Sequence, residues 1–200
     1  MKKIGILNIG YGNVNRLKSS LQKINLGEIV LVNKNNLCEV EVLFLPGVGN
    51  FHEVSKLYDK MIRNYIINHI DNGSKVIGIC VGMQLLFSSS EEGNGYGLNL
   101  IDGKVKKILG NEEPVPNIGQ LIPIWQNFLI PEFIKENYYY HTHSYYCNVT
   151  DKNCSVLASI HYNKISIPVI IKKNNLLGFQ FHPELSNYQG LALLKYFVNE

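Results

Sequence analysis

The chain has 200 residues, of which 46% are hydrophobic and 18% are charged, so its composition is that of an ordinary globular protein and we expect one domain over residues 1–200. Its formal charge of +3 comes from scattered lysines and from only two arginines, Arg16 and Arg63, which argues against a nucleic-acid-binding surface. Four cysteines without a CxxC pair, the lack of a signal-peptide core and the lack of an apolar run of roughly 18 residues predict a reduced, cytoplasmic protein that does not enter a membrane.

The first half of the chain alternates short apolar segments with amphipathic ones. The spacing of apolar residues predicts strands at Lys3–Asn8, Glu28–Val32, Val40–Leu45 and Lys75–Ile79, and helices at Asn15–Lys23 and Tyr58–Ile70. Continuous apolar strands that alternate with such helices indicate a parallel sheet covered on both faces, which is the doubly wound α/β arrangement.

The second half has a different pattern, in which short apolar segments are separated by Gly, Pro and Asn. We expect antiparallel strands at Val105–Leu109, Tyr138–Tyr140, Ser144–Cys147, Val156–Ile160, Ile167–Lys172 and Leu176–Phe181. A turn at 173–175 and a closing helix at Tyr188–Val198 complete this half. The predicted fold is therefore α/β, with a doubly wound, largely parallel sheet and an antiparallel C-terminal extension.

A glycine-flanked cysteine joins the predicted strand Lys75–Ile79 to a helical segment at Met83–Phe87. The sequence there is Gly78-Ile79-Cys80-Val81-Gly82, and a nucleophile on a sharp strand-to-helix turn needs small residues two positions away on each side. A helix N-terminus also favours the thiolate over the thiol. On this segment alone, a small buried cysteine in a glycine-rich turn is an equally good interpretation.

A histidine and a carboxylate follow the last predicted strand, in the segment His182-Pro183-Glu184. Residues i and i+2 of an extended backbone face the same side, so Glu184 is expected to orient the His182 ring while that ring takes the thiol proton. A lone His-x-Glu is also typical of a surface histidine beside a solvated carboxylate. Together with the cysteine turn, however, it predicts a Cys-His-Glu triad.

At these residues the chain resembles the class I, or triad, glutamine amidotransferases. Both GICVGMQLLF around Cys80 and GFQFHPE around His182 match that family, and within it the chain is similar to the glutaminase subunits of imidazole glycerol phosphate synthases. Further matching segments occur in the same order along the chain: Gly10–Asn13, Pro46–Gly49, Ser90–Gly93 and His143–Tyr146.

The resemblance implies that Cys80 attacks the side-chain amide of L-glutamine, that ammonia leaves, and that water hydrolyses the resulting glutamyl thioester. His182 would move the protons and Glu184 would hold the ring. Backbone amides of Val81 and of the loop formed by Gly47, Val48 and Gly49 would stabilise the oxyanion. The residues expected to hold the substrate are Gln84, Glu92, Ser144 and Tyr145. No cofactor and no metal are expected, and His141-Thr142-His143 with Cys147 is interpreted as strand residues near the cleft and not as a metal site.

The resemblance also implies a heterodimer, in which ammonia passes to a synthase or cyclase subunit. The partner would contact Asn13 and the rim positions Asn117, Gln120 and Leu185. Glutaminases of the histidine pathway usually have P-H-M-G-W-N where this chain has residues 116–121, and a lysine where it has Leu185. The main expectation is therefore histidine biosynthesis. The alternatives are a paralogue that supplies ammonia for amidotransfer on a bacterial surface sugar, or a catalytically silent regulatory subunit.

Overall fold

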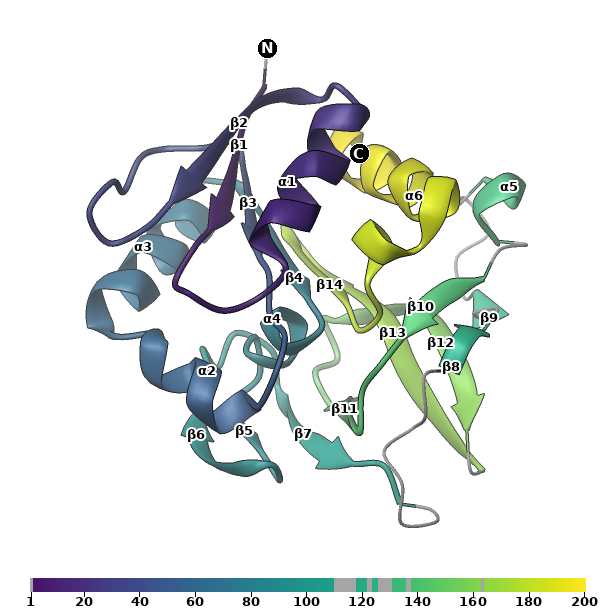
Figure 1. Ribbon diagram of the computed structural model, residues 1–200. Helices are drawn as coiled ribbons and strands as arrows, with labels where there is room; N and C mark the ends of the chain where they lie inside the picture. Colours follow the sequence, from purple (N-terminus) through teal and green to yellow (C-terminus); the bar gives the residue numbers. More distant parts are fainter. Residues whose placement is uncertain (1, 110–117, 122–123, 126–130, 136–137, 163) are drawn as a thin grey trace.

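The protein is described by a computed structural model that covers residues 2–109, 118–121, 124–125, 131–135, 138–162 and 164–200. An eight-stranded sheet crosses the molecule in the order β2-β1-β3-β4-β14-β13-β12-β9 (Figure 1). Its first five strands run parallel to one another: β1 (Lys2–Leu7), β2 (Gly27–Val32), β3 (Val42–Leu45), β4 (Lys75–Ile79) and β14 (Leu176–Phe179). This confirms the predicted parallel half.

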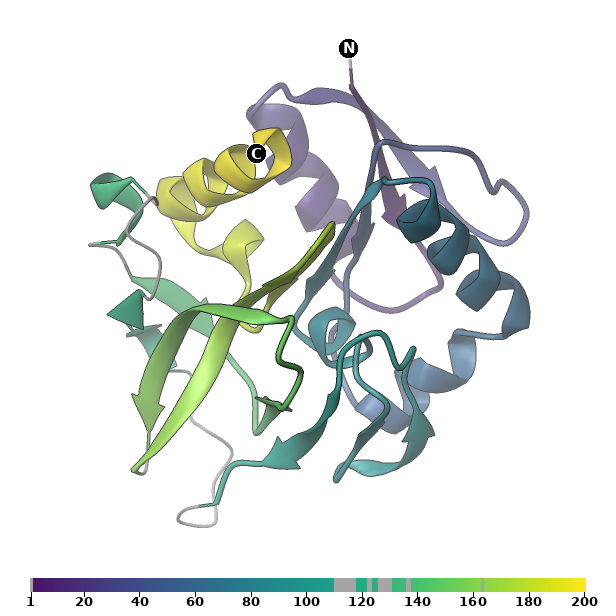
Figure 2. The same cartoon turned by 180° about the vertical axis from the view of Figure 1, so that it is seen from behind.

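Helices lie on both faces of the parallel strands. Helix α1 (Val14–Lys23) contacts α6 (Asn187–Asn199) on one face, while α3 (Lys60–Asp71) covers the other (Figures 1 and 2). α1 directs Val14, Leu17 and Leu21 into the core, which matches the predicted spacing. Because both faces are covered, the central strands are apolar at nearly every position; all four residues of β3 are buried.

The remaining strands of the large sheet are antiparallel, as predicted for the second half. β12 (Ser155–Tyr162) pairs with β13 (Ile165–Lys173) and with β9 (Ile124–Trp125). β13 then turns into β14 through Asn174, which has a φ of 52°. Asparagine adopts this left-handed conformation more readily than most residues, which explains the turn.

Two smaller sheets complete the fold. β10 (Tyr139–His141) pairs with β8 (Ile118–Leu121), and a four-stranded sheet has the order β11-β7-β5-β6. The strands of that sheet are β11 (Tyr145–Val149), β7 (Gly103–Lys107), β5 (Ser89–Ser90) and β6 (Gly93–Tyr96). The short helix α5 (Glu132–Lys135) lies close to α6. Among the described residues, no helix is long and apolar enough to cross a bilayer.

Some expected elements differ from the observed ones. The segment at Leu176–Phe181 was predicted to be antiparallel, which is wrong on one side, because β14 pairs antiparallel with β13 but parallel with β4. The helix expected at Tyr58–Ile70 begins at Lys60, since the Asp59 side chain accepts the Ile62 N–H and caps it. A separate helix, α2 (Phe51–Leu57), precedes it. The apolar pattern did not indicate these boundaries, because polar caps set them.

Candidate active site

Cys80 lies on a strained turn between β4 and the short helix α4 (Val81–Gln84). Its backbone has φ 53° and ψ −111°, a conformation that an L-residue rarely adopts and that typically costs about 1–3 kcal/mol. Both flanking glycines are required. A Cβ at Gly78 would lie 2.5 Å from the Gly82 carbonyl oxygen, and a Cβ at Gly82 would overlap the carbonyl oxygen of Leu45. The predicted sharp strand-to-helix turn is therefore present. The helical segment expected at Met83–Phe87 is instead a single turn at Val81–Gln84.

His182 and Glu184 form a buried pair beyond the end of β14. The Nδ1 atom of His182 lies 2.8 Å from Oε1 of Glu184, and both residues are almost fully buried. The predicted pairing is present, but the predicted reason for it is wrong. Pro183–Leu185 forms a 3₁₀ turn, so Glu184 reaches the ring from a helical turn and not from an extended strand.

The charge state of His182 is set by its partners. Burial by itself lowers the pKa of a histidine, but hydrogen bonds to Cys80 and Glu184 and their negative charges outweigh it and raise the pKa of His182 to about 10. Because Nδ1 faces Glu184, the other ring nitrogen, Nε2, is the one available to Cys80. An imidazole that contacts both a cysteine and a carboxylate is the arrangement that a cysteine nucleophile requires.

The loop at Gly47–Gly49 lies directly against the cysteine turn. A Cβ at Gly47 would lie 2.5 Å from the Gly82 nitrogen and 2.8 Å from the Val81 Cβ, so only glycine fits there. Gly49 has a φ of 110°, which is also accessible mainly to glycine. Val48, between them, has 39% of its surface exposed. The candidate oxyanion amides thus lie where the backbone of the loop meets that of the turn.

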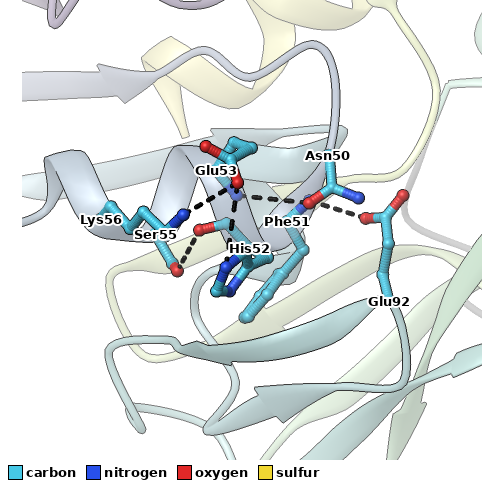
Figure 3. A network of polar contacts seen from close by, with 7 residues as sticks. All are labelled: Asn50, Phe51, His52, Glu53, Ser55, Lys56 and Glu92. Atoms are coloured by element: carbon cyan, nitrogen blue, oxygen red, sulfur yellow. Dashed lines mark hydrogen bonds and ion pairs between the residues drawn. The ribbon is translucent and has the colours of Figure 1, made fainter.

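Glu92 is held at the end of this loop, where α2 begins (Figure 3). The Phe51 N–H donates to Glu92 Oε2 at 2.6 Å, and Asn50 caps the helix by accepting the Glu53 N–H at 3.2 Å. Burial raises the pKa of Glu92, while hydrogen bonds from Phe51 and the Asn50 side chain lower it. Sequence reasoning assigned Glu92 to the substrate. The structure adds a contact that ties it to the loop.

Gln84 and Tyr145 lie together on the same side of the site. The Nε2 of Gln84 is 3.5 Å from the carbonyl oxygen of Tyr145 and 3.5 Å from Oε1 of Gln180. Burial, and then the negative charges of Glu92 and Glu91, raise the pKa of the Tyr145 phenol. Glu92 is therefore close enough to Tyr145 for its charge to affect that side chain. The carbonyl of Ser144 accepts the Ile108 N–H at 2.9 Å, which leaves its amide and side chain for other contacts.

Several residues that hold the 3₁₀ turn were not found by sequence reasoning. Arg16 Nε and Ser20 Oγ, both on α1, each lie 3.4 Å from the Glu184 carbonyl oxygen. Ser186 Oγ donates to the His182 carbonyl at 2.7 Å and accepts the Tyr140 N–H at 2.9 Å. The α1 residues are 168 and 164 positions from Glu184 in the sequence, so no local pattern could have indicated their role.

The described residues that were expected to contact a partner lie in three different segments. Leu185 is half-buried in the 3₁₀ turn, Asn13 is exposed before α1, and Gln120 lies in β8. β8 pairs with β10, whose Tyr140 carbonyl accepts the His182 N–H at 3.0 Å. Asn117 lies outside the described residues. Within the described part of the chain, no cluster of three or more His, Cys, Asp or Glu side chains could hold a metal ion.

Comparison of the sequence with known proteins shows a match to one family over almost the whole chain. Residues 6–199 match the family described as glutamine amidotransferase class-I. The chain is 38% identical over 203 residues to subunit HisH of imidazole glycerol phosphate synthase from Methanosarcina barkeri, an alignment that covers 100% of the chain and 99% of the relative. It is 33% identical over 202 residues to the HisH subunit from Prochlorococcus marinus, with 99% and 98% covered.

Solved structures share the fold at lower sequence identity. A putative GMP synthase subunit from Thermoplasma acidophilum superposes with a TM-score of 0.72 at 20% identity, covering 100% of this chain and 93% of that one. A PurLQS structure from Thermotoga maritima gives 0.70 at 17% identity, with 100% and 99% covered. These matches agree with the predicted α/β arrangement.

Proposed function

Because the chain belongs to the class I glutamine amidotransferase family, we propose that it is the glutaminase subunit of an imidazole glycerol phosphate synthase. The observation that carries the proposal is the strained turn at Cys80 with a charged His182 beside it. Full-length similarity to HisH subunits at 33% and 38% identity supports the choice of synthase. The 200 residues then form one amidotransferase domain that acts in the cytoplasm.

The proposed chemistry begins with the Cys80 thiolate attacking the side-chain carboxamide carbon of L-glutamine. The carbonyl oxygen becomes an oxyanion, for which the Val81 amide and an amide of the Gly47–Gly49 loop are the donors. His182 gives its proton to the departing nitrogen, so ammonia leaves and a glutamyl thioester remains. His182 then takes a proton from water, which attacks the thioester, releasing glutamate and regenerating the thiolate. Glu184 keeps the ring oriented and charged throughout.

We propose that four residues hold the substrate: Gln84, Glu92, Ser144 and Tyr145. We place the glutamine α-ammonium at the Glu92 carboxylate, and its α-carboxylate and amide within reach of Gln84, Ser144 and Tyr145. Since Glu92 also accepts the Phe51 N–H at 2.6 Å, a substrate bound there touches the end of the Gly47–Gly49 loop indirectly. The glycines of that loop allow its peptides to reorient when a partner docks.

The proposed partner is a cyclase or synthase subunit that consumes the ammonia. It would contact Asn13, Asn117, Gln120 and Leu185. Of these, Gln120 lies in β8 and Leu185 in the 3₁₀ turn, and both elements contact β10. An arrangement of this kind delivers ammonia without releasing it. The isolated chain should hydrolyse glutamine slowly, and the loaded complex should do so faster.

Loss of the thiol tests the function. Cys80→Ala should abolish synthesis from glutamine in the complex but leave synthesis from added ammonium salts intact, because the partner keeps its own chemistry. Glutamine turnover at the wild-type rate in this variant would remove Cys80 as the nucleophile. Loss of both activities would show instead that the variant has not assembled.

A second candidate is a glutaminase that feeds amidotransfer on a surface sugar, and the side chains at the rim favour it. Gln120 and Leu185 stand where histidine-pathway subunits usually carry a tryptophan and a lysine. Large aromatic and charged groups often dominate an interface. Under this candidate, the chain should bind its own partner more tightly than it binds a histidine-pathway cyclase from a species whose glutaminase carries the usual motifs. The expected difference is at least ~10-fold in affinity, or about 1.4 kcal/mol. Titration calorimetry of both pairs measures it. Equal affinities would return the assignment to histidine biosynthesis.

A further inference from the structure

A second pair of buried imidazoles lies next to the triad, at the end of β10. Nδ1 of His141 is 3.2 Å from Nε2 of His143, and Nδ1 of His143 is 2.9 Å from the Tyr145 carbonyl oxygen. His141 has no exposed surface and His143 has 8%. The chemistry proposed above uses neither residue, so their contacts require a separate explanation.

Hydrogen-bond complementarity fixes the proton positions on both rings. The Tyr145 carbonyl can only accept, so Nδ1 of His143 must carry a proton. In a neutral ring Nε2 is then a bare acceptor, and Nδ1 of His141 must donate to it. The opposite tautomer of His141 would set two lone pairs against each other at 3.2 Å. Both rings therefore carry the proton on Nδ1, and Nε2 of His141 is an acceptor that makes no hydrogen bond to the described residues.

The environment of the two rings keeps them neutral. Burial lowers the pKa of His143 to about 4, and a hydrogen bond to the Tyr145 carbonyl only partly opposes this. Burial, the other imidazole and the charge of His182 also lower the pKa of His141. The ring of Phe181 covers His141, with centroids 5.3 Å apart. A neutral pair can keep the directed hydrogen bonds described above, because each ring then has one donor and one acceptor.

The hydrogen bonds that run from His141 through His143 end at Tyr145, one of the residues proposed to bind glutamine. The Tyr145 carbonyl receives His143 at 2.9 Å and Gln84 at 3.5 Å, and Gln84 lies one helical turn after Cys80. The shorter bond fixes the carbonyl oxygen of the Tyr145–Tyr146 peptide, and it thereby restrains the backbone that follows Ser144 and Tyr145, the two residues proposed to contact the ligand. Without His143, the longer Gln84 contact would be the remaining side-chain hydrogen bond from the described residues to this oxygen.

We propose that His143 is a positioning residue for glutamine binding, which holds the Tyr145 carbonyl through its Nδ1–H while His141 locks the tautomer. His143 does not touch the reacting atoms. Its consequence for glutamine binding rests on the proposed glutaminase function. The tautomers do not, because they follow from the hydrogen-bond geometry of two neutral rings.

The tautomers can be measured without any turnover, in the full chain labelled with ¹⁵N on histidine. Signals are assigned by comparison with His141→Phe and His143→Asn, with His161→Asn as an exposed control on β12. At neutral pH we expect His141 and His143 to be neutral with the proton on Nδ1. A proton on Nε2 of His143, or a charged His143, would overturn the proposal.

Kinetics of matched variants test the positioning role. His143→Phe should raise the KM for glutamine roughly tenfold, the effect of losing one hydrogen bond, with a smaller change in kcat. His143→Asn should restore most of the loss, because its amide can donate from the position of Nδ1, whereas His143→Gln should not. Equal KM values for the Phe and Asn variants would overturn the positioning role. Ammonium-dependent synthesis should stay normal in both, and inactivity of the wild-type chain would instead count against the proposed function.

Discussion

His182 and His143 are both buried, they lie close enough for the charge of one to act on the other, and yet they are held in opposite charge states. His182 is paired with Glu184 and Cys80, and its pKa is raised to about 10. His143 is paired with a second imidazole and a backbone carbonyl, and its pKa is lowered to about 4. Burial pushes both values downward, so the partners decide the outcome.

Under the proposed function, this difference in charge separates two tasks within one site. A ring that exchanges protons with a thiol needs an anionic partner, which keeps it charged and oriented. A ring that holds a backbone carbonyl must stay neutral and directional, which burial without an anion achieves. The charge of His182 also helps to keep both neighbouring imidazoles neutral, so the two regions reinforce each other.

Removing the His182 ring and removing the His143 ring should have the most different effects on glutamine turnover. His182→Ala should lower the turnover of glutamine by roughly 10⁴-fold, because proton transfer and the thiolate partner are lost together. The His143 variants described above should change mainly KM. Steady-state kinetics on the partner-bound complex will check this. Comparable losses of kcat in both would erase the distinction between a proton-transfer residue and a positioning residue.

A milder change removes only the carboxylate charge. Glu184→Gln should reduce turnover by roughly 10-fold to 100-fold, less than loss of the ring, since the amide can still contact Nδ1. The pKa of His182 should fall, because its hydrogen bond to the carboxylate and the negative charge of Glu184 help to raise it. NMR titration of the His182 ring measures that fall. An unchanged pKa would mean that Glu184 does not set the charge.

The smallest effect is on stability, where the two regions should act in opposite pH windows. His182 binds its proton more tightly in the folded state, so its contribution is complete below pH 6.5 and is lost as the pH rises toward about 10. His143 stays neutral when folded, so its contribution is present above pH 6.5 and is lost as the pH falls toward about 4. The free energy of unfolding can be measured with urea across this pH range. Its pH dependence should weaken on the alkaline side in His182→Gln and on the acid side in His143→Asn. Weakening on the same side in both variants would contradict the assignment.

The sequence predicted most of the framework and the triad, because those signals are local. The apolar runs predicted β1 to β4, and the glycines around Cys80 predicted a sharp strand-to-helix turn that the structure contains. The strain at Cys80 was seen only in the structure. The His182–Glu184 pairing was also expected, although a 3₁₀ turn makes it.

Contacts between distant segments could not be predicted in the same way. Arg16 and Ser20 reach the Glu184 carbonyl from α1, and Glu92 accepts the Phe51 N–H across 41 positions of sequence. His141 and His143 are close in sequence, but their role depends on Tyr145 and on burial that only the fold supplies. The tautomers follow from this packing and not from the sequence motif.

One NMR titration of the histidine rings tests the central claim that the partners of His182 overcome the effect of burial on its pKa, whereas burial prevails at His143. In the wild-type chain, His182 should remain an imidazolium well above pH 6.5 and lose its proton near pH 10, while His143 should remain neutral down to about pH 4. In Cys80→Ala the His182 value should fall, because one of its hydrogen bonds is gone. Titration of both rings near their ordinary value of 6.5, with no response to loss of Cys80, would contradict the account.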